Sequence, residues 1–227
     1  MDFRSLLFWR KPPIADLEAL AEFIDERGAF VVQKGIYEYA RARAGHYAKV
    51  MFSERMFLDA VEVSRWTAYP LGLAMVTELA EGILLPHAAE ARQRQLTHLS
   101  SLVLSTYDKY AIPEALSAET WLAARAELAR RLQLIGLHPP KRALDVPKPF
   151  ARTYFDLMPI HPELRASDWP TTRSYLKIMM CNVHDELTQR MDAPLISRLL
   201  LQGAGAGKAT HLLPASSTNA TGSRPDA

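Results

Sequence analysis

Cysteine is nearly absent from this sequence, which has only Cys181 among its 227 residues. One cysteine cannot build a disulfide framework, and it excludes zinc fingers and iron–sulfur clusters that need several thiolates. Long apolar runs are absent too. The longest uncharged one, Trp66–Thr77, is far shorter than the roughly 20 residues of a membrane span. The apolar run Ser5–Trp9 is too short for a secretory signal. These absences favour a cytoplasmic protein.

Neither sign of charge is in large excess, because 27 basic residues stand against 25 acidic ones and the formal net charge is +2. A net charge this small does not by itself indicate that the protein binds nucleic acid. The apolar residues make up 48% of the chain, which is typical of a soluble globular protein. A chain of this length can bury a core without cross-links.

Signals for β-strands are missing as well. The chain has no Asn-Gly or Asp-Gly hairpin turn and no sustained alternation of β-branched residues. Apolar residues recur instead at steps of three and four, as on one face of a helix. We therefore predict an all-α fold, a single globular multi-helix domain of six to eight helices. The expected organisation is an apolar and basic N-terminal segment (1–13), a helical domain (14–202) and a disordered C-terminal tail (203–227).

Caps, prolines and glycines indicate where the helices begin and end. Pro70 lies inside the second helix and predicts a kink or a break at 68–71, because proline lacks a backbone donor and clashes with the preceding turn. Gly28 and Gly35 share one face of the first helix and predict close approach by a neighbouring helix, although the run 30–32 leaves a short strand open as an alternative. Asp16, Ser53, Ser117 and Asp192 are expected N-caps, with Ser167 or Asp168 before the last long helix. The expected helices span 16–44, 53–85, 88–110, 117–136, 150–158, 168–191 and 193–201.

Several familiar catalytic and cofactor motifs fail on inspection. The stretch 203–208 resembles a phosphate loop but has Gln202 where a glycine is required and Ala209 where a Ser or Thr should bind magnesium. No Gly-x-Ser-x-Gly elbow occurs. The seven histidines are scattered, and His184 and Asp185 are neighbours that point about 100° apart on a helix. We therefore predict neither a metal nor a cofactor.

The last long helix carries the most informative polar set. Arg173, Lys177, Cys181, His184 and Thr188 border its core-facing stripe. Nearby cations would lower the pKa of a thiol and raise its reactivity, so a Cys181–His184 dyad is one interpretation. A site for an anion or an acidic partner is a second. The third is a half-buried cysteine beside a solvated basic edge, with no chemical role.

Two further basic stretches accompany this helix. Arg41 and Arg43 lie in the segment 34–49 with interleaved tyrosines, and Lys141 and Arg142 lie in the proline-rich connector 137–149. Together with Arg173 and Lys177 they would form a basic face, provided that they meet in space. Such a face suits an acidic protein segment or an anionic surface, and single-stranded nucleic acid less well.

The N-terminal residues 3–11 contain five large apolar side chains, which are flanked by Arg4, Arg10 and Lys11. We expect them to dock on the protein's own helices. The alternative is peripheral contact with the inner membrane, in which the aromatic rings enter the headgroup layer and the cations meet anionic lipid.

Four stretches carry a resemblance to known proteins: FWRKPP (8–13), GIYEYARARAGHY (35–47), IGLHPPKR (135–142) and CNVHDEL (181–187). Over about residues 1–200 the chain resembles a family of uncharacterised alphaproteobacterial helical proteins, some of which carry an esterase label. The resemblance implies a cytoplasmic bacterial setting. It assigns no catalytic residue.

These observations favour a non-catalytic helical binding or adaptor protein. Its predicted binding residues are those of the basic face: Arg41, Arg43, Lys141, Arg142, Arg173 and Lys177. The alternative is a small, esterase-like hydrolase that uses Cys181 and His184, with Asp185 nearby.

Overall fold

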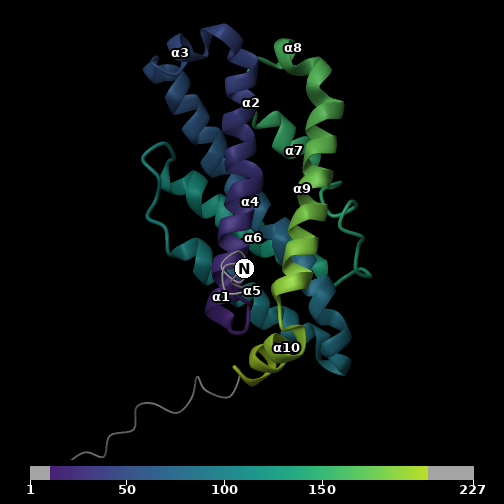
Figure 1. Cartoon of the computed structure of the whole chain (residues 1–227). Helices are drawn as coiled ribbons and strands as arrows, with labels where there is room; N and C mark the ends of the chain where they lie inside the picture. Colours follow the sequence, from purple (N-terminus) through teal and green to yellow (C-terminus); the bar gives the residue numbers. More distant parts are fainter. Residues whose placement is uncertain (1–10, 204–227) are drawn as a thin grey trace, which may run out of the picture.

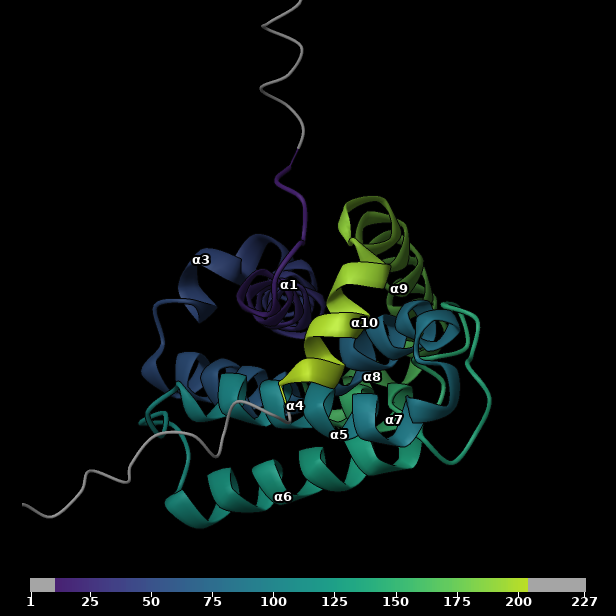
Figure 2. The same cartoon turned by 90° about the horizontal axis from the view of Figure 1, so that it is seen from below.

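The computed structural model describes residues 11–203 and contains no β-strand in that range. Seven of its α-helices have ten residues or more, which confirms the predicted all-α fold of six to eight helices. The helices lie in layers: α1 and α9 on one side, α4 and α5 in the middle, and α6 on the other side (Figure 2). The predicted tail beyond Gly203 and the apolar run 3–9 lie outside the described residues.

The first helical rod consists of α1 (Leu17–Ala29), the π-helical turn η2 (Phe30–Lys34) and α2 (Gly35–Ala44) (Figure 1). Asp16 caps it as predicted, because its carboxylate accepts a hydrogen bond from the Ala19 amide at 2.7 Å. The run 30–32, where a strand was the alternative, is part of η2. Gly45 ends the rod with a φ of 55°, a conformation that glycine adopts without strain.

The central helix is α4 (Arg55–Leu84), and it contradicts two predictions from the sequence, the break that was one alternative at Pro70 and the cap at Ser53. Pro70 does not divide it, since the helix is continuous over 30 residues. A proline inside a helix costs about 3 kcal/mol through the lost hydrogen bond and the ring clash, and the continuous burial of residues 68–81 compensates for that cost. Ser53 does not cap the helix either. Its hydroxyl donates to the Val50 carbonyl at 2.7 Å, and Glu54 occupies the cap position.

The rod crosses α4 with its backbone in direct contact. A Cβ atom on Gly28 would lie 3.0 Å from the backbone nitrogen of Leu73, and one on Gly72 would overlap the Gly28 carbonyl. This confirms the close approach predicted at Gly28. Beside the crossing, the Tyr69 hydroxyl donates to the Asp25 carboxylate at 2.6 Å.

Helices α5 (Arg92–Asp108) and α6 (Ala118–Ile135) pack on α4 and on each other. Ser117 caps α6 as predicted, accepting from the Thr120 amide at 3.1 Å. α5 begins at Arg92, not at 88 as predicted, because the reversal after α4 is made by two 3-10 turns (Leu85–His87 and Ala89–Ala91). The connector that follows α6 leads into the short helix α7 (Ala151–Asp156).

The chain closes with α8 (Pro162–Arg165), α9 (Trp169–Arg190) and α10 (Ala193–Gln202). Asp192 caps α10 as predicted, accepting from the Leu195 amide at 3.1 Å. Asp168, one of the two predicted residues, occupies the N-cap position of α9, but its side chain makes no capping hydrogen bond. Ile14 forms an isolated bridge with Met191, and this bridge fastens the chain before α1 to the end of α9.

One described helix, α4 with the turn that follows it, is long and apolar enough to cross a membrane by length and composition alone. Of the residues in its most apolar stretch, 83% are buried inside the protein, as in the core helix of a water-soluble domain.

The helix crossing yields a prediction for stability. Gly72→Ala should lower the free energy of unfolding by about 1–3 kcal/mol, because the added methyl group would overlap the Gly28 carbonyl. The matched control is Gly82→Ala in the same helix, whose Cβ would meet only Pro140 Cβ, at 3.7 Å. That variant should gain up to about 1 kcal/mol from helix propensity. Denaturant unfolding of both variants measures the difference, and equal stabilities would contradict the crossing.

Candidate functional site

The predicted basic residues are distributed over three places. Arg43 pairs with Asp168 at 3.3 Å and also donates to the Leu164 carbonyl, which joins the end of α2 to the beginning of α9. Lys141 pairs with the buried Glu78 of α4 at 2.7 Å. Arg142 pairs with Asp145 at 2.8 Å. Three of the six cations are therefore held in ion pairs within the protein.

The other three cations of the predicted face are Arg41, Arg173 and Lys177. Within residues 11–203 none of them forms an ion pair. Arg173 and Lys177 lie on α9, the helix whose beginning Arg43 reaches through Asp168.

The predicted dyad on α9 is present as neighbouring residues without a hydrogen bond. Cys181 is half-buried, and its thiol makes no hydrogen bond to His184 in the described part of the chain. His184 instead lies 3.5 Å from the Asp185 carboxylate, measured from Nδ1 to Oδ1. Among the described residues no cluster of three His, Cys, Asp or Glu side chains could hold a metal ion.

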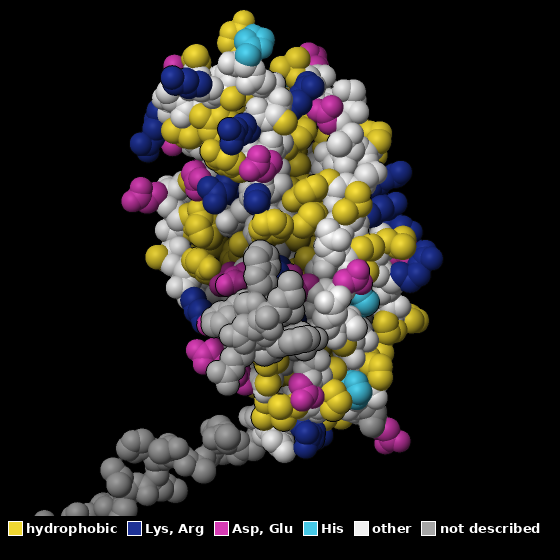
Figure 3. Space-filling model, viewed as in Figure 1, with side chains coloured by type: hydrophobic (Ala, Val, Ile, Leu, Met, Phe, Trp, Pro, Cys, Tyr) yellow, Lys and Arg dark blue, Asp and Glu magenta, His cyan; other side chains and the backbone are white. Residues whose placement is uncertain are grey.

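A pocket of about 350 Å³ lies between the first rod, α7 and α9. Hydrophobic side chains gather in the seam between α2 and α9 on the molecular surface (Figure 3). We call this cavity the tyrosine pocket; its lining residues are Phe30, Lys34, Gly35, Glu38, Tyr39, Tyr154, Met158, Thr171, Thr172, Tyr175 and Met179. Met179 is half-buried; it packs against the core and also forms part of this wall.

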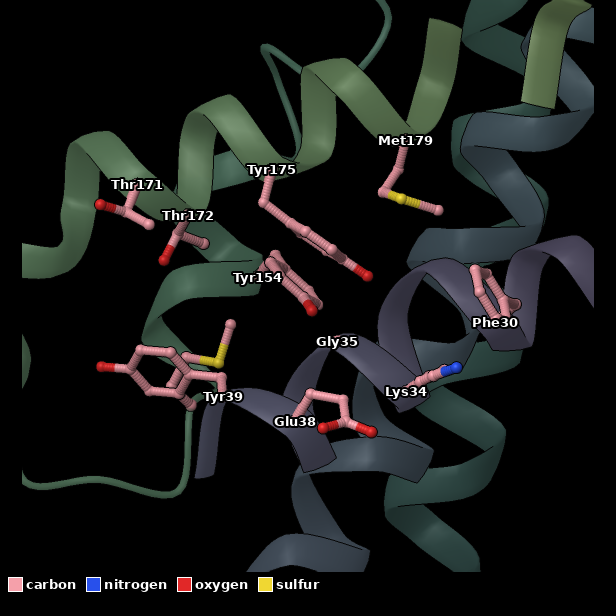
Figure 4. A pocket seen from close by; sticks show the side chains of 11 residues that line it. Phe30, Lys34, Gly35, Glu38, Tyr39, Tyr154, Thr171, Thr172, Tyr175 and Met179 are labelled. Carbon is pink, nitrogen blue, oxygen red and sulfur yellow. The ribbon is translucent and has the colours of Figure 1, made fainter. Parts of the chain in front are cut away.

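Two tyrosine hydroxyls are fixed on the π turn that borders the pocket. The Tyr154 hydroxyl donates to the Val32 carbonyl at 3.1 Å, and the Tyr175 hydroxyl donates to the Val31 carbonyl at 2.9 Å. Tyr154 comes from α7 and Tyr175 from α9, and both point toward Gly35 (Figure 4). A π turn misaligns helical carbonyls and is often found at functional sites. Here it offers two adjacent carbonyls to side chains from other helices.

Gly35 makes the room for these hydroxyls. A Cβ atom at this position would lie 2.5 Å from the Tyr154 oxygen and 2.7 Å from the Tyr175 oxygen. The close approach predicted at Gly35 is made by side chains of two neighbouring helices, α7 and α9, and not by a helix backbone as at Gly28.

The electrostatics keep both hydroxyls neutral. Burial raises the pKa of Tyr175 to about 12, with a further contribution from the Glu38 carboxylate. Burial likewise raises the pKa of Tyr154 well above its usual range. At the rim, Lys34 Nζ lies 4.8 Å from the centre of the Phe30 ring, and Glu38 forms no ion pair among residues 11–203. The pocket thus combines apolar walls with neutral hydroxyls and one charge of each sign at its edge.

Tyr39 links α2 to the beginning of α9 at one end of the pocket. Its hydroxyl donates to Asp168 at 2.7 Å, the same carboxylate that Arg43 reaches. Burial and this hydrogen bond raise the pKa of Tyr39 above its usual range. From the N-cap position of α9, the Asp168 side chain therefore clamps α2 to the beginning of α9 and makes no capping hydrogen bond.

Sequence reasoning missed this site. Tyr154 and Tyr175 are separated from the π turn by more than 120 positions, so no local pattern links them. The one available signal was a glycine inside a helix next to the β-branched run at 31–32.

No protein-family model, curated protein or solved structure matches this chain. The case for the tyrosine pocket therefore depends on its geometry.

The raised pKa of Tyr175 predicts how stability changes in alkaline solution. The folded state holds the proton up to about pH 12, whereas an unfolded tyrosine releases it near pH 10.0. The stabilising contribution is therefore complete below pH 10.0 and is lost as the pH rises toward 12. Tyr175→Phe should remove a slope of about 1.4 kcal/mol per pH unit over this window. Denaturant unfolding at a series of pH values checks it, with the exposed Tyr47→Phe as control, and parallel curves for Tyr175→Phe and the wild type would contradict it.

Proposed function

We propose that this protein is a non-catalytic helical binding protein and that the tyrosine pocket holds its ligand. The observation that carries the proposal is the preformed cavity in which two tyrosine hydroxyls, one buried and one half-buried, are fixed to the π turn. A volume of about 350 Å³ is at the lower end of the range of small-molecule sites. Mostly apolar walls with a few oriented polar groups are typical of such sites.

The chemistry of the walls favours a small apolar ligand with one hydrogen-bond donor. Tyr154 and Tyr175 have already donated their protons to backbone carbonyls, so toward a ligand their oxygens act as acceptors. Glu38 adds an acceptor at the rim. Phe30 and Met179 provide surfaces for an aromatic or aliphatic body.

The lining residues support binding more than catalysis. None of them is a serine, cysteine or histidine, and tyrosines with raised pKa values are poor bases and poor nucleophiles at neutral pH. The alternative, a hydrolase that uses Cys181 and His184, lacks support from a hydrogen bond between the two side chains. Arg41, Arg173 and Lys177, which form no ion pairs within residues 11–203, are the part of the predicted basic face that we propose for an acidic partner or an anionic surface.

The pocket can be tested with 2-naphthol, which combines an apolar double ring with one O–H donor. We expect saturable binding by calorimetry and a rise in melting temperature. Binding of 2-methoxynaphthalene, which lacks the donor, should be about fivefold weaker, because a hydrogen bond contributes about 1 kcal/mol. Met179→Trp should abolish binding by filling the cavity. The matched control is Ile178→Trp, at the neighbouring position on α9, where the native side chain is 61% exposed.

Circular dichroism and melting curves of both tryptophan variants establish that they fold. Absence of saturable naphthol binding to the wild-type protein would refute the proposed ligand class. Equal binding by Met179→Trp and the wild type would place the ligand elsewhere and refute the pocket.

A further inference from the structure

One end of the molecule exposes large apolar side chains that the fold does not cover. We call residues 45–56 the apical tip; it comprises the turn after α2, the short helix α3 (Ala48–Met51) and the start of α4. Tyr47 is 61% exposed, Val50 58% and Met56 87%. The tip lies at the end of the molecule opposite α10 (Figure 1).

The aromatic side chains on the inner face of the tip pack against one another within the fold. The rings of Tyr37 and Phe52 meet edge to face at 5.1 Å, and Phe52 meets Phe57 at the same distance. This aromatic ladder joins α2 to α4 beneath α3. Tyr47, Val50 and Met56 make no part of it, so their exposure is not required by the packing below them.

A fourth exposed apolar side chain lies at the same end of the molecule. Leu164 of α8 is 63% exposed, and its carbonyl accepts a hydrogen bond from Arg43 of α2. Both α3 and α8 lie at this end of the molecule (Figure 1). Leu164 therefore adds an exposed apolar side chain at the same end of the molecule as the tip.

The charge around the tip is strongly biased. Between residues 41 and 56 the chain has four cations and one acid, a local net charge of +3 against +2 for the whole sequence. The cations are Arg41, Arg43, Lys49 and Arg55, and the acid is Glu54. Arg43 pairs with Asp168 at 3.3 Å and Arg55 pairs with Asp59 at 2.9 Å, so Arg41 and Lys49 are the cations of this stretch that form no ion pair within residues 11–203. Lys and Arg side chains lie beside hydrophobic ones at this end of the surface (Figure 3).

We propose that the apical tip docks on an anionic lipid bilayer. Tyr47, Val50 and Met56 project from a turn and helix ends, a convex arrangement that suits insertion among lipid headgroups. Arg41 and Lys49, which form no ion pair within residues 11–203, would meet lipid phosphates, and this charge complementarity favours an anionic bilayer over a second copy of this equally basic tip. This surface is independent of the ligand proposed for the tyrosine pocket.

The test is co-sedimentation of the full chain with vesicles. The vesicles are phosphatidylcholine alone or phosphatidylcholine with roughly 30% phosphatidylglycerol. We expect binding to the anionic vesicles only, and a decrease when NaCl is raised from about 0.1 M to about 0.5 M, because salt screens the attraction. The double substitution Tyr47→Ser with Val50→Ser should lower the partition coefficient at least about tenfold. Lys49→Glu should also weaken binding.

The matched control is Leu122→Ser on α6, where the native side chain is as exposed as Tyr47, at 61%. It should bind like the wild type. A variant lacking residues 1–10 separates the tip from the apolar N-terminal segment, and it should keep most of the binding. Melting curves show that each variant is folded.

Three results would overturn the proposal. The first is no binding to anionic vesicles, or equal binding to neutral ones. The second is unchanged binding by the Tyr47/Val50 double variant, or loss of binding on deletion of residues 1–10 alone. The third is a dimer in light scattering that the double variant abolishes, without vesicle binding, which would make a second copy the occupant.

Discussion

The architecture depends on the backbone contact between α1 and α4 at Gly28 and Gly72. With no side chain between them, the two helices approach until a Cβ on Gly72 would overlap the Gly28 carbonyl. This approach places the rod directly against a central helix that is buried along most of its second half. The same proximity lets the Tyr69 hydroxyl reach Asp25. The other helices pack around this pair, and the backbone contact sets the spacing between its two helices.

The tyrosine pocket results from the shape of the rod about one turn beyond that crossing. The rod passes through the π turn η2, which directs the Val31 and Val32 carbonyls toward tyrosines of α9 and α7. Gly35 comes next and leaves space where a side chain would strike both hydroxyls. Two long-range hydrogen bonds thus hold α7 and α9 at a fixed distance from the rod, and the cavity is the space that remains between them.

The sequence predicted features with local causes and missed those with distant ones. The caps at Asp16, Ser117 and Asp192 were correct, because each cap joins residues three positions apart. The break that was one alternative at Pro70 does not occur, because the packing that keeps α4 continuous comes from other helices. The pocket was missed because its tyrosines are 122 and 144 positions from their carbonyl partners. For the same reason the ion pair between Lys141 and Glu78 could not be foreseen.

Helix α2 connects the two proposed binding elements, and its length constrains how they act together. Ten residues separate Gly35 in the pocket from Gly45 at the tip, which at 1.5 Å per residue is about 15 Å. With the tip among lipid headgroups, the pocket lies outside the hydrocarbon layer, since a tip of this size enters only about 5–10 Å. A ligand would then reach the pocket from water or from the headgroup region. The clamp of Tyr39 and Arg43 on Asp168 lies between the two elements, so displacement of α2 at the tip would strain the contacts that shape the pocket.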